Sequence, residues 1–274
     1  MTDNPLRQYF RRPALYLKLP SGGNFYPADS IDMPENGEVP IYPMTAIDEI
    51  TSKTPDALYN GVAVTDIIKS CVPSIKNPWV IPAIDIDPIL VAIRAASGDG
   101  TLELESTCPK CDDSSSYGVN LSGILQTYTP GDYNTPLDLG ELKVKFKPLS
   151  YKQINDANIA QTELQRAMIQ ASVIEDDDKK LKESSRLLSA INNITLSVIC
   201  ESIEHVQTPT LKVDNKEHIM DFLKNSDRNT YERIKNTSIE LRASTETKPL
   251  KLKCISCSHD YEQPFVLNVS DFFA

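Results

Sequence analysis

The chain has 274 residues, enough for one large domain or two of ordinary size, and 40% of them are hydrophobic, enough for a packed core. Aspartate and glutamate outnumber lysine and arginine by 38 to 28, so the formal charge is −10, and such an acidic chain works against nucleic-acid binding. No stretch approaches the roughly 20 apolar residues of a membrane span, and the N-terminus has no signal-peptide character. The cysteines include CxxC pairs rather than being scattered, which favours a reducing cytoplasm, and we expect no contact with a membrane.

Residues 1–43 are rich in proline and glycine, which excludes long helices and favours extended strands joined by tight turns. Residues 14–19 alternate, with three leucines on one face, and predict a strand. Residues 38–43 form a second extended run, and its prolines assign it to the edge of a sheet. The sequence thus predicts an extended, β-rich N-terminal segment.

Residues 44–99 predict a region of short helices. Thr45 and Asp48 have the spacing of a capping box, in which the acid reaches back to a free backbone amide. Thr54-Pro55 predicts a further helix start, with proline at the first helical position. Apolar residues then recur at helical spacing through Cys71.

Two aspartates later in this region, Asp85 and Asp87, could suggest a paired-acid site. Asp87 is better explained as a cap, because Asp87-Pro88 has the form of a helix start. The helix predicted from it runs over residues 89–96 and ends at Gly98.

Two cysteine pairs, Cys108-Pro-Lys-Cys111 and Cys254-Ile-Ser-Cys257, each stand where an alternating strand turns back on itself. Two cysteines separated by two residues in a tight turn can direct both thiolates at one ion, and two such turns form a tetrahedral zinc site. The 142 residues between the pairs far exceed the spacing of about 15–20 in ordinary zinc ribbons. A shared zinc ion therefore requires a domain inserted into a split ribbon.

Other uses of these and neighbouring residues remain open. One alternative is a redox dithiol, but the sequence around the pairs lacks the βαβ setting of thioredoxin-like motifs. Another is that His259 replaces one cysteine as a ligand, although a solvated histidine is the simpler interpretation. Cys71 and Cys200 lie in apolar helical patterns and are expected to pack in the core as small hydrophobic residues.

Beyond the first pair, residues 142–147 alternate and predict a strand with its lysines in water. Ser150 and Gln153 form a second capping box, which opens a helix to about residue 173. The charge run at 175–180 predicts a solvated loop or a helix start, before a long helix through residues 187–199. A third helical region covers residues 216–241.

These patterns predict the α+β class, with four regions along the chain. The expected regions are an extended N-terminal segment (1–43), short helices (44–99), a split zinc ribbon with flanking strands (100–148 and 242–274) and a helical insertion (149–241).

Signals for catalysis are missing from the sequence. The three histidines have no catalytic spacing, and there is no nucleophile elbow, phosphate loop or zinc-protease helix. Four cysteines would saturate a zinc ion, and a site without an open coordination position is structural. We expect a protein that is not an enzyme.

A family resemblance is carried by Asn4 to Gly23, Pro40 to Ile50, Lys53 to Leu58, Ile68 to Pro73, Pro78-Trp79, Asp85, Asp87 and Glu105 to Cys111. These residues resemble the baseplate proteins of T4-like contractile-tailed bacteriophages, among them hub subunits and hub-assembly factors. The resemblance is specific over residues 1–111 and weaker over the helical insertion. It returns near the second cysteine pair and the terminal Asp271-Phe-Phe.

The resemblance implies a protein that helps to build the central hub of the tail baseplate, as a chaperone-like factor or as a hub subunit. Its implied partners are other baseplate hub or tape-measure proteins. Its implied location is the host cytoplasm during assembly, with the tail baseplate of the virion as a second location. The family brings no catalytic residues, and the positions it transfers are the four cysteines as metal ligands.

The N-terminal block is a candidate docking arm, because interfaces favour aromatic and arginine anchors. Its residues are Arg7, Tyr9, Phe10, Arg11 and Arg12. The alternative is that the two aromatic residues simply cover the core. If the arm binds a partner, deletion of residues 1–12 should abolish co-purification while the thermal transition stays intact.

A second function class is a nucleic-acid-binding zinc-ribbon accessory protein. Acids follow both cysteine pairs (Asp112, Asp113, Asp260 and Glu262) and would repel phosphates, although two lysines precede the second pair. A third class, a dithiol oxidoreductase, predicts an exposed thiolate of low pKa.

Overall fold

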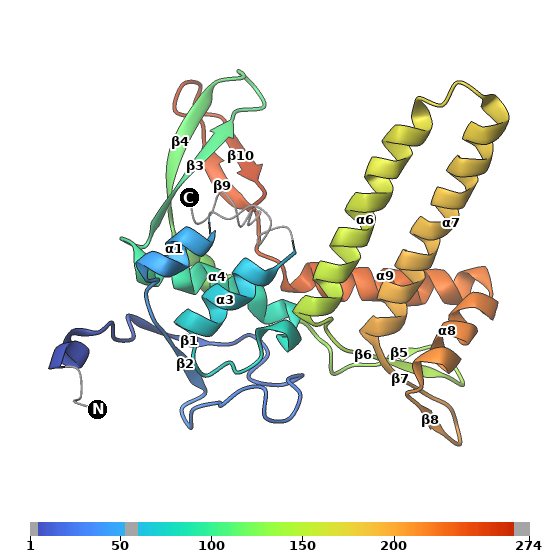
Figure 1. Cartoon of the computed structure of the whole chain (residues 1–274), viewed down its shortest axis with the longest axis horizontal. Coiled ribbons are helices and arrows are strands. Elements are labelled where there is room, and N and C mark those ends of the chain that lie inside the picture. The colour runs from blue at the N-terminus through green and yellow to red at the C-terminus, as the bar shows by residue number, and fades with distance from the viewer. Residues whose placement is uncertain (1–4, 53–59, 266–274) are drawn as a thin grey trace. The chain divides into compact units, whose positions relative to one another are not determined.

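The computed structural model describes residues 5–52 and 60–265, and it combines helices with small antiparallel sheets (Figure 1). The expected mixture of helices and strands is confirmed. The chain forms two compact units: unit 1 is Met1–Thr129 with Glu246–Ala274, and unit 2 is Pro130–Thr245. Unit 2 is therefore inserted between the two cysteine pairs. The predicted helix start at Thr54-Pro55 and the terminal Asp271-Phe-Phe lie outside the described residues.

The N-terminal part of unit 1 contains a short two-stranded sheet. After the 3₁₀ turn η1 (Pro5–Tyr9), strand β1 (Leu15–Lys18) pairs antiparallel with β2 (Glu38–Ile41). The inward-facing positions of the two strands, such as Leu17 and Val39, are buried. Both predicted strands are confirmed, and Pro40 is tolerated because each strand of such a sheet is an edge strand.

Short helices pack beside this sheet: α1 (Ala46–Ser52), α3 (Val62–Cys71), η2 (Pro78–Val80) and α4 (Ala83–Ser97). The capping box is confirmed, because Thr45 donates its amide to Asp48 Oδ2 (2.7 Å) while Asp48 donates its amide to Thr45 Oγ1 (3.2 Å). The helical spacing through Cys71 is also confirmed, since that face of α3 is buried.

Helix α4 begins earlier than the sequence predicts. It starts at Ala83, so Asp87 does not cap it, and Pro88 lies inside the helix. The helix starts before Asp87 because Ile84 and Ile86 are buried, so that apolar packing stabilises the helical turn that precedes Pro88. Proline then removes a single backbone hydrogen bond close to the helix start. The predicted end before Gly98 is confirmed.

Two hairpins carry the cysteine pairs. Strand β3 (Thr101–Thr107) pairs with β4 (Ser114–Asn120), and β9 (Leu250–Lys253) pairs with β10 (Asp260–Gln263), both antiparallel. A short helix, α5 (Leu121–Leu125), follows the first hairpin, with the Asn120 side chain capping its first turn. Figure 1 shows the two hairpins side by side, although nearly half of the chain lies between them in sequence.

Unit 2 contains a four-stranded antiparallel sheet in the order β5-β6-β7-β8. Its strands are β5 (Leu137–Asp138), β6 (Lys143–Phe146), β7 (Ile203–Gln207) and β8 (Lys212–Val213). The predicted strand at residues 142–147 is present as β6, and it pairs within unit 2 rather than beside the cysteine hairpins. Strand β7 is not predicted from the sequence, because its two buried positions directly continue a long helical pattern.

Four helices complete unit 2: α6 (Tyr151–Ser172), α7 (Asp177–Ser202), α8 (Lys216–Asn225) and α9 (Arg228–Thr245). The Ser150–Gln153 capping box is confirmed, and the charge run begins α7 with Asp176 as its cap. The third helical region divides into two helices, because Ser226 is extended and Asp227 caps the second one.

Candidate metal centre

The four paired cysteines converge at the tips of the two hairpins. Their sulfur atoms all lie within 4.8 Å of one another, with 3.7 Å between Cys108 and Cys257 and 3.6 Å between Cys111 and Cys254. A tetrahedral zinc ion with metal–sulfur bonds of about 2.3 Å needs sulfur–sulfur separations of about 3.8 Å. The thiol cage therefore has the dimensions of a four-thiolate zinc site.

The two turns have the same backbone design. In the first, the Asp112 amide donates to the Cys108 carbonyl (3.0 Å); in the second, the Ser258 amide donates to the Cys254 carbonyl (2.9 Å). Asp112 and Ser258 both have the positive φ of the left-handed region, 54° and 57°. Each CxxC segment thus bends back on itself, so that both of its thiols face the other hairpin.

Backbone amides also act on the sulfur atoms. The Cys257 amide donates to Cys254 Sγ (3.4 Å), and this contact lowers the pKa of Cys254 to about 7. The Asp113 amide lowers the pKa of Cys111, but the neighbouring thiols outweigh it and raise that pKa to about 12. Because the four thiols lie so close together, few of them can be ionised at the same time. A bound cation would therefore displace protons from the thiols.

Hydrogen bonds between polar side chains also join the two hairpins, both along the strands and at the cysteine turns. Tyr261 donates to Ser106 (3.0 Å), and Ser106 donates to Gln263 (2.9 Å), which links β3 to β10. At the turns, Ser256 donates to Asp113 (2.7 Å). These bonds orient the two turns toward one another through contacts other than the cysteines.

The remaining candidate ligands lie elsewhere. Among the described residues, His259 is not a member of the cluster, and its carbonyl accepts the Cys254 amide (2.9 Å). Cys71 and Cys200 are both buried, which confirms their expected place in the core.

Within the candidate docking arm, Arg11 is held against the core, whereas the residues before it are exposed. The Arg11 guanidinium is half-buried and donates to the Pro43 carbonyl, to the Ser70 carbonyl and hydroxyl (2.8 Å each) and to the Asp48 carboxylate (3.3 Å). It therefore anchors the arm to helices α1 and α3. Nothing in the local sequence signals this network, because its members lie 32 to 59 residues from Arg11.

Before this anchor, apolar side chains of the arm face solvent. Tyr9 is 77% exposed and Phe10 is 58% exposed, and Leu6 is exposed as well. Arg7 and Arg12, on either side, are also exposed. The interpretation that Tyr9 and Phe10 cover the core does not fit these exposures. Within residues 5–52 and 60–265, none of the helices combines the length and the hydropathy that a membrane span requires.

One family model, described as T4 bacteriophage base plate protein, matches residues 17–274. The match spans both cysteine pairs and the whole of unit 2, and so it extends beyond the region where the resemblance is specific in the sequence. No curated protein and no solved structure matches the chain. With nearly its entire length matched, the chain belongs to the T4 bacteriophage base plate protein family.

Proposed function

We propose that this baseplate protein is a non-enzymatic factor that builds the central hub through protein–protein contacts, as a chaperone-like protein or as a hub subunit. Family membership gives it a structural or assembly role in the phage baseplate, with other baseplate proteins as partners. The four-cysteine cluster supports the non-enzymatic part of the proposal, because a cage of four thiolates leaves a zinc ion no open position for a substrate.

The exposed N-terminal arm is the proposed contact with a hub or tape-measure protein. Aromatic and arginine side chains dominate binding hot spots, and the arm presents both kinds next to a fixed anchor. An anchored arm loses less conformational entropy on binding than a free one, which favours affinity.

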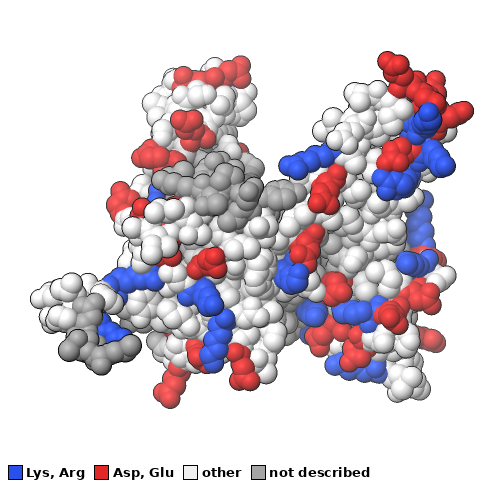
Figure 2. Space-filling view, in the orientation of Figure 1, with Lys and Arg blue, Asp and Glu red and all other residues white. Residues whose placement is uncertain are grey.

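The proposed zinc ion has a structural role, in which it fastens the two hairpins that flank unit 2. Metal affinity is then part of the folding free energy of unit 1, since cysteine pairs with 142 residues between them in sequence converge only in the folded chain. Nucleic-acid binding is the weaker alternative, because acidic side chains dominate the visible face of the hairpins (Figure 2).

Quantitative mass spectrometry of mature virions and of isolated tail-assembly intermediates tests the assembly role. Presence in intermediates and absence from virions identifies a chaperone-like factor, whereas retention in virions identifies a hub subunit. Absence from both contradicts the proposal. A filter-binding assay at low salt tests the nucleic-acid alternative, for which we expect no retention.

Substitution of the arm aromatics tests the docking contact more sharply than deletion of residues 1–12, which would also remove the Arg11 anchor. We expect Tyr9→Ala with Phe10→Ala to lose co-purification with the hub partner and to keep its thermal transition. Tyr16→Ala is the matched control, because Tyr16 is also exposed (60%) but lies on β1, outside the arm. Unchanged binding by the double variant would contradict the arm proposal.

Native mass spectrometry tests the metal. We expect one zinc ion per chain, and a lower melting temperature after chelation, because the ion binds only the folded state. Cys111→Ser removes an exposed ligand and should abolish stoichiometric zinc, whereas Cys200→Ser, outside the cluster, should retain it. A wild-type protein that is purified without zinc and is unaffected by added zinc would exclude the structural role.

A further inference from the structure

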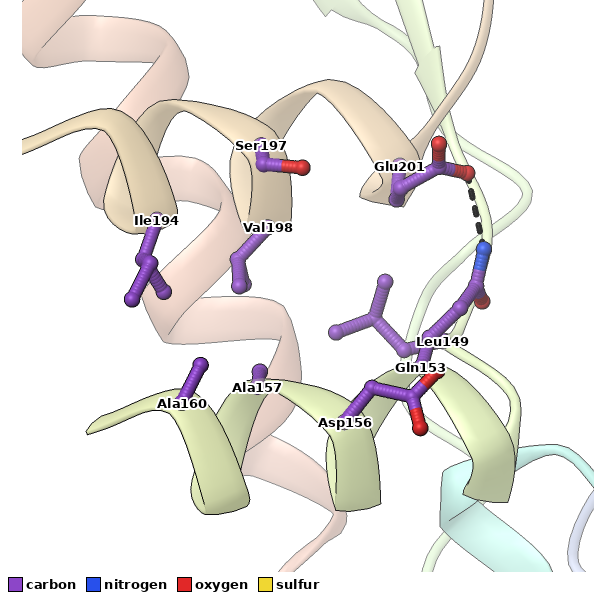
Figure 3. Close-up of a pocket in the computed structure, with 9 residues that line it drawn as sticks. All are labelled: Leu149, Gln153, Asp156, Ala157, Ala160, Ile194, Ser197, Val198 and Glu201. Atoms are coloured by element: carbon purple, nitrogen blue, oxygen red, sulfur yellow. Dashed lines mark hydrogen bonds between the residues drawn. The ribbon is translucent and has the colours of Figure 1, made fainter. Parts of the chain in front are cut away.

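The antiparallel helices α6 and α7 of unit 2 leave an open groove along the seam between them. The lower part of the groove lies near the start of α6 and has a volume of about 310 Å³. The upper part lies nearer the turn between the helices and has a volume of about 450 Å³, and Ala160 and Ile194 line both parts. In Figure 3, Ala157 and Ala160 of α6 point toward Ile194 and Val198 of α7, and small side chains on one side leave the space unfilled. The groove therefore has an apolar floor.

Helix α6 buries almost none of its side chains against the part of the chain that the structure describes. Of its 22 residues, all of which the structure describes, Ala171 is the one that is buried. Helices in proteins are stabilised mainly by the packing of an apolar face, so a helix of this length with so little burial calls for another packing partner. Helix α9 crosses the far side of the pair in the view of Figure 3.

The surface around the groove resembles an interface more than a solvated helix pair. Leu187 to Cys200 of α7 contains no charged residue over fourteen positions. Figure 2 shows charged side chains along the outer edge of α6 and at the turn of the hairpin, with a mostly uncharged surface between the helices. An uncharged centre with a charged rim is the usual anatomy of a protein–protein contact.

We propose that this face binds the same face of a second copy of the chain, so that two α6–α7 hairpins form a four-helix bundle about a two-fold axis. Such a contact is self-complementary by symmetry, and bundles of this kind pack apolar seams face to face. The inference depends neither on the hub assignment nor on the metal.

The side chains on the two rims favour one orientation of the axis. Asp156 of α6 lines the lower groove together with Ser197 and Glu201 of α7, and Glu163 lines the upper groove together with Asn193 and Arg186 of α7. An axis parallel to the helices stacks α6 of one copy on α7 of the other at the same level. The Asp156 and Glu163 carboxylates then lie near the level of Ser197 and Asn193 of the other copy, and the Glu201 carboxylate lies at the level of Gln153 of the other copy. An axis across the helices would instead bring Asp156 close to Glu163 of the second copy, and like charges repel.

The area of the face is sufficient for a dimer. A helix of 22 residues is about 33 Å long, and two adjacent helices are about 20 Å wide. Each copy would bury about 650 Å², or about 1,300 Å² in total, which falls within the range of specific interfaces.

Sedimentation of the purified full-length chain across the micromolar range tests the proposal, with Asn193→Asp as the diagnostic variant. The wild type should dimerise, and the new carboxylate opposite Glu163 should weaken the dimer by about tenfold or more. Asn192→Asp is the matched control, because it adds the same charge at the neighbouring exposed position outside the groove and should leave the dimer intact. Glu163→Lys combined with Asn193→Asp should restore the dimer through opposite charges.

Circular dichroism melting of each variant separates loss of association from loss of folding. A wild-type chain that is monomeric at every concentration would overturn the proposal. A dimer that N193D and N192D affect equally would overturn it as well, because the groove face would not be the contact. Neither result would bear on the hub role, which the virion and intermediate measurements test separately.

Discussion

At the scale of single residues, Asp85 shows how an acid can serve the fold without serving a site. It is fully buried on α4, and Ser21 donates to it from both its amide (2.9 Å) and its hydroxyl. Burial raises the pKa of Asp85 to about 6, and the Ser21 bonds only partly offset this rise. The contact fixes the turn after β1 to α4, so the residue positions the N-terminal segment.

The elevated pKa of Asp85 predicts a pH dependence of stability. Its value in the unfolded chain is 3.8, so between pH 4 and 6 the folded protein binds more protons than the unfolded chain. The contribution of Asp85 to stability is therefore complete below about pH 4 and declines as the pH rises through 6. Linkage gives a loss of about 2 kcal/mol between pH 4 and pH 7.

Asp85→Asn removes this titration, and comparison with the wild type cancels other ionisable groups. The free energy of unfolding of D85N, relative to the wild type, should rise by about 2 kcal/mol from pH 4 to pH 7. Urea denaturation at several pH values measures the difference. A difference that stays constant with pH would show that Asp85 is ionised in the folded protein with an ordinary pKa.

At the scale of elements, the two cysteine turns are built alike but use different residues at the left-handed position. Asp112 occupies it in the first turn and Ser258 in the second. Aspartate tolerates this region better than serine does, and glycine tolerates it best. The second turn therefore carries the larger backbone strain.

Ser258→Gly should relieve that strain and stabilise the zinc-loaded protein by about 0.5–1 kcal/mol, after allowance for the entropy of glycine in the unfolded chain. Chemical denaturation in the presence of zinc measures the change. Ser258→Ala, which retains a Cβ atom, should give no such gain. Equal effects of glycine and alanine would show that the serine hydroxyl, and not the backbone, determines the stability here.

At the scale of the whole molecule, the ends of unit 2 lie together. Gly131 has a positive φ of 67°, and a Cβ atom at this position would lie 2.7 Å from Cγ2 of Thr245, so the second and last residues of the unit are in close contact. A domain whose two ends are adjacent can be inserted into another domain without forcing apart the residues that flank the insertion.

This arrangement predicts that the two units can be separated. A fragment of residues 130–245 should unfold cooperatively, because it has its own sheet and core. A chain in which a short glycine–serine linker replaces residues 132–244 should still bind zinc through all four cysteines. Calorimetry of the fragment and native mass spectrometry of the shortened chain check both outcomes. Loss of zinc binding in a shortened chain that remains folded would show that unit 2 is needed to assemble the metal site.

Local signals in the sequence account for much of the fold. The Thr45–Asp48 and Ser150–Gln153 capping boxes mark real helix starts, because a cap is satisfied by residues three apart. Where burial outweighs the local signal, the prediction fails: apolar packing of Ile84 and Ile86 starts α4 before the Asp87-Pro88 dipeptide. Strand β7 was missed because its pairing with β6 joins segments about 60 residues apart.

The sequence by itself identified the four cysteines of the cluster, because the CxxC spacing and the flanking strands encode each cysteine turn locally. It also determined two helix starts through their capping boxes and, through its resemblance, the family. The tertiary structure decided that the two cysteine pairs meet, that Arg11 is an anchor while Tyr9 and Phe10 remain exposed, and that α6 and α7 share an open groove. These features depend on contacts between residues far apart in the chain, and such contacts form only when the whole core packs.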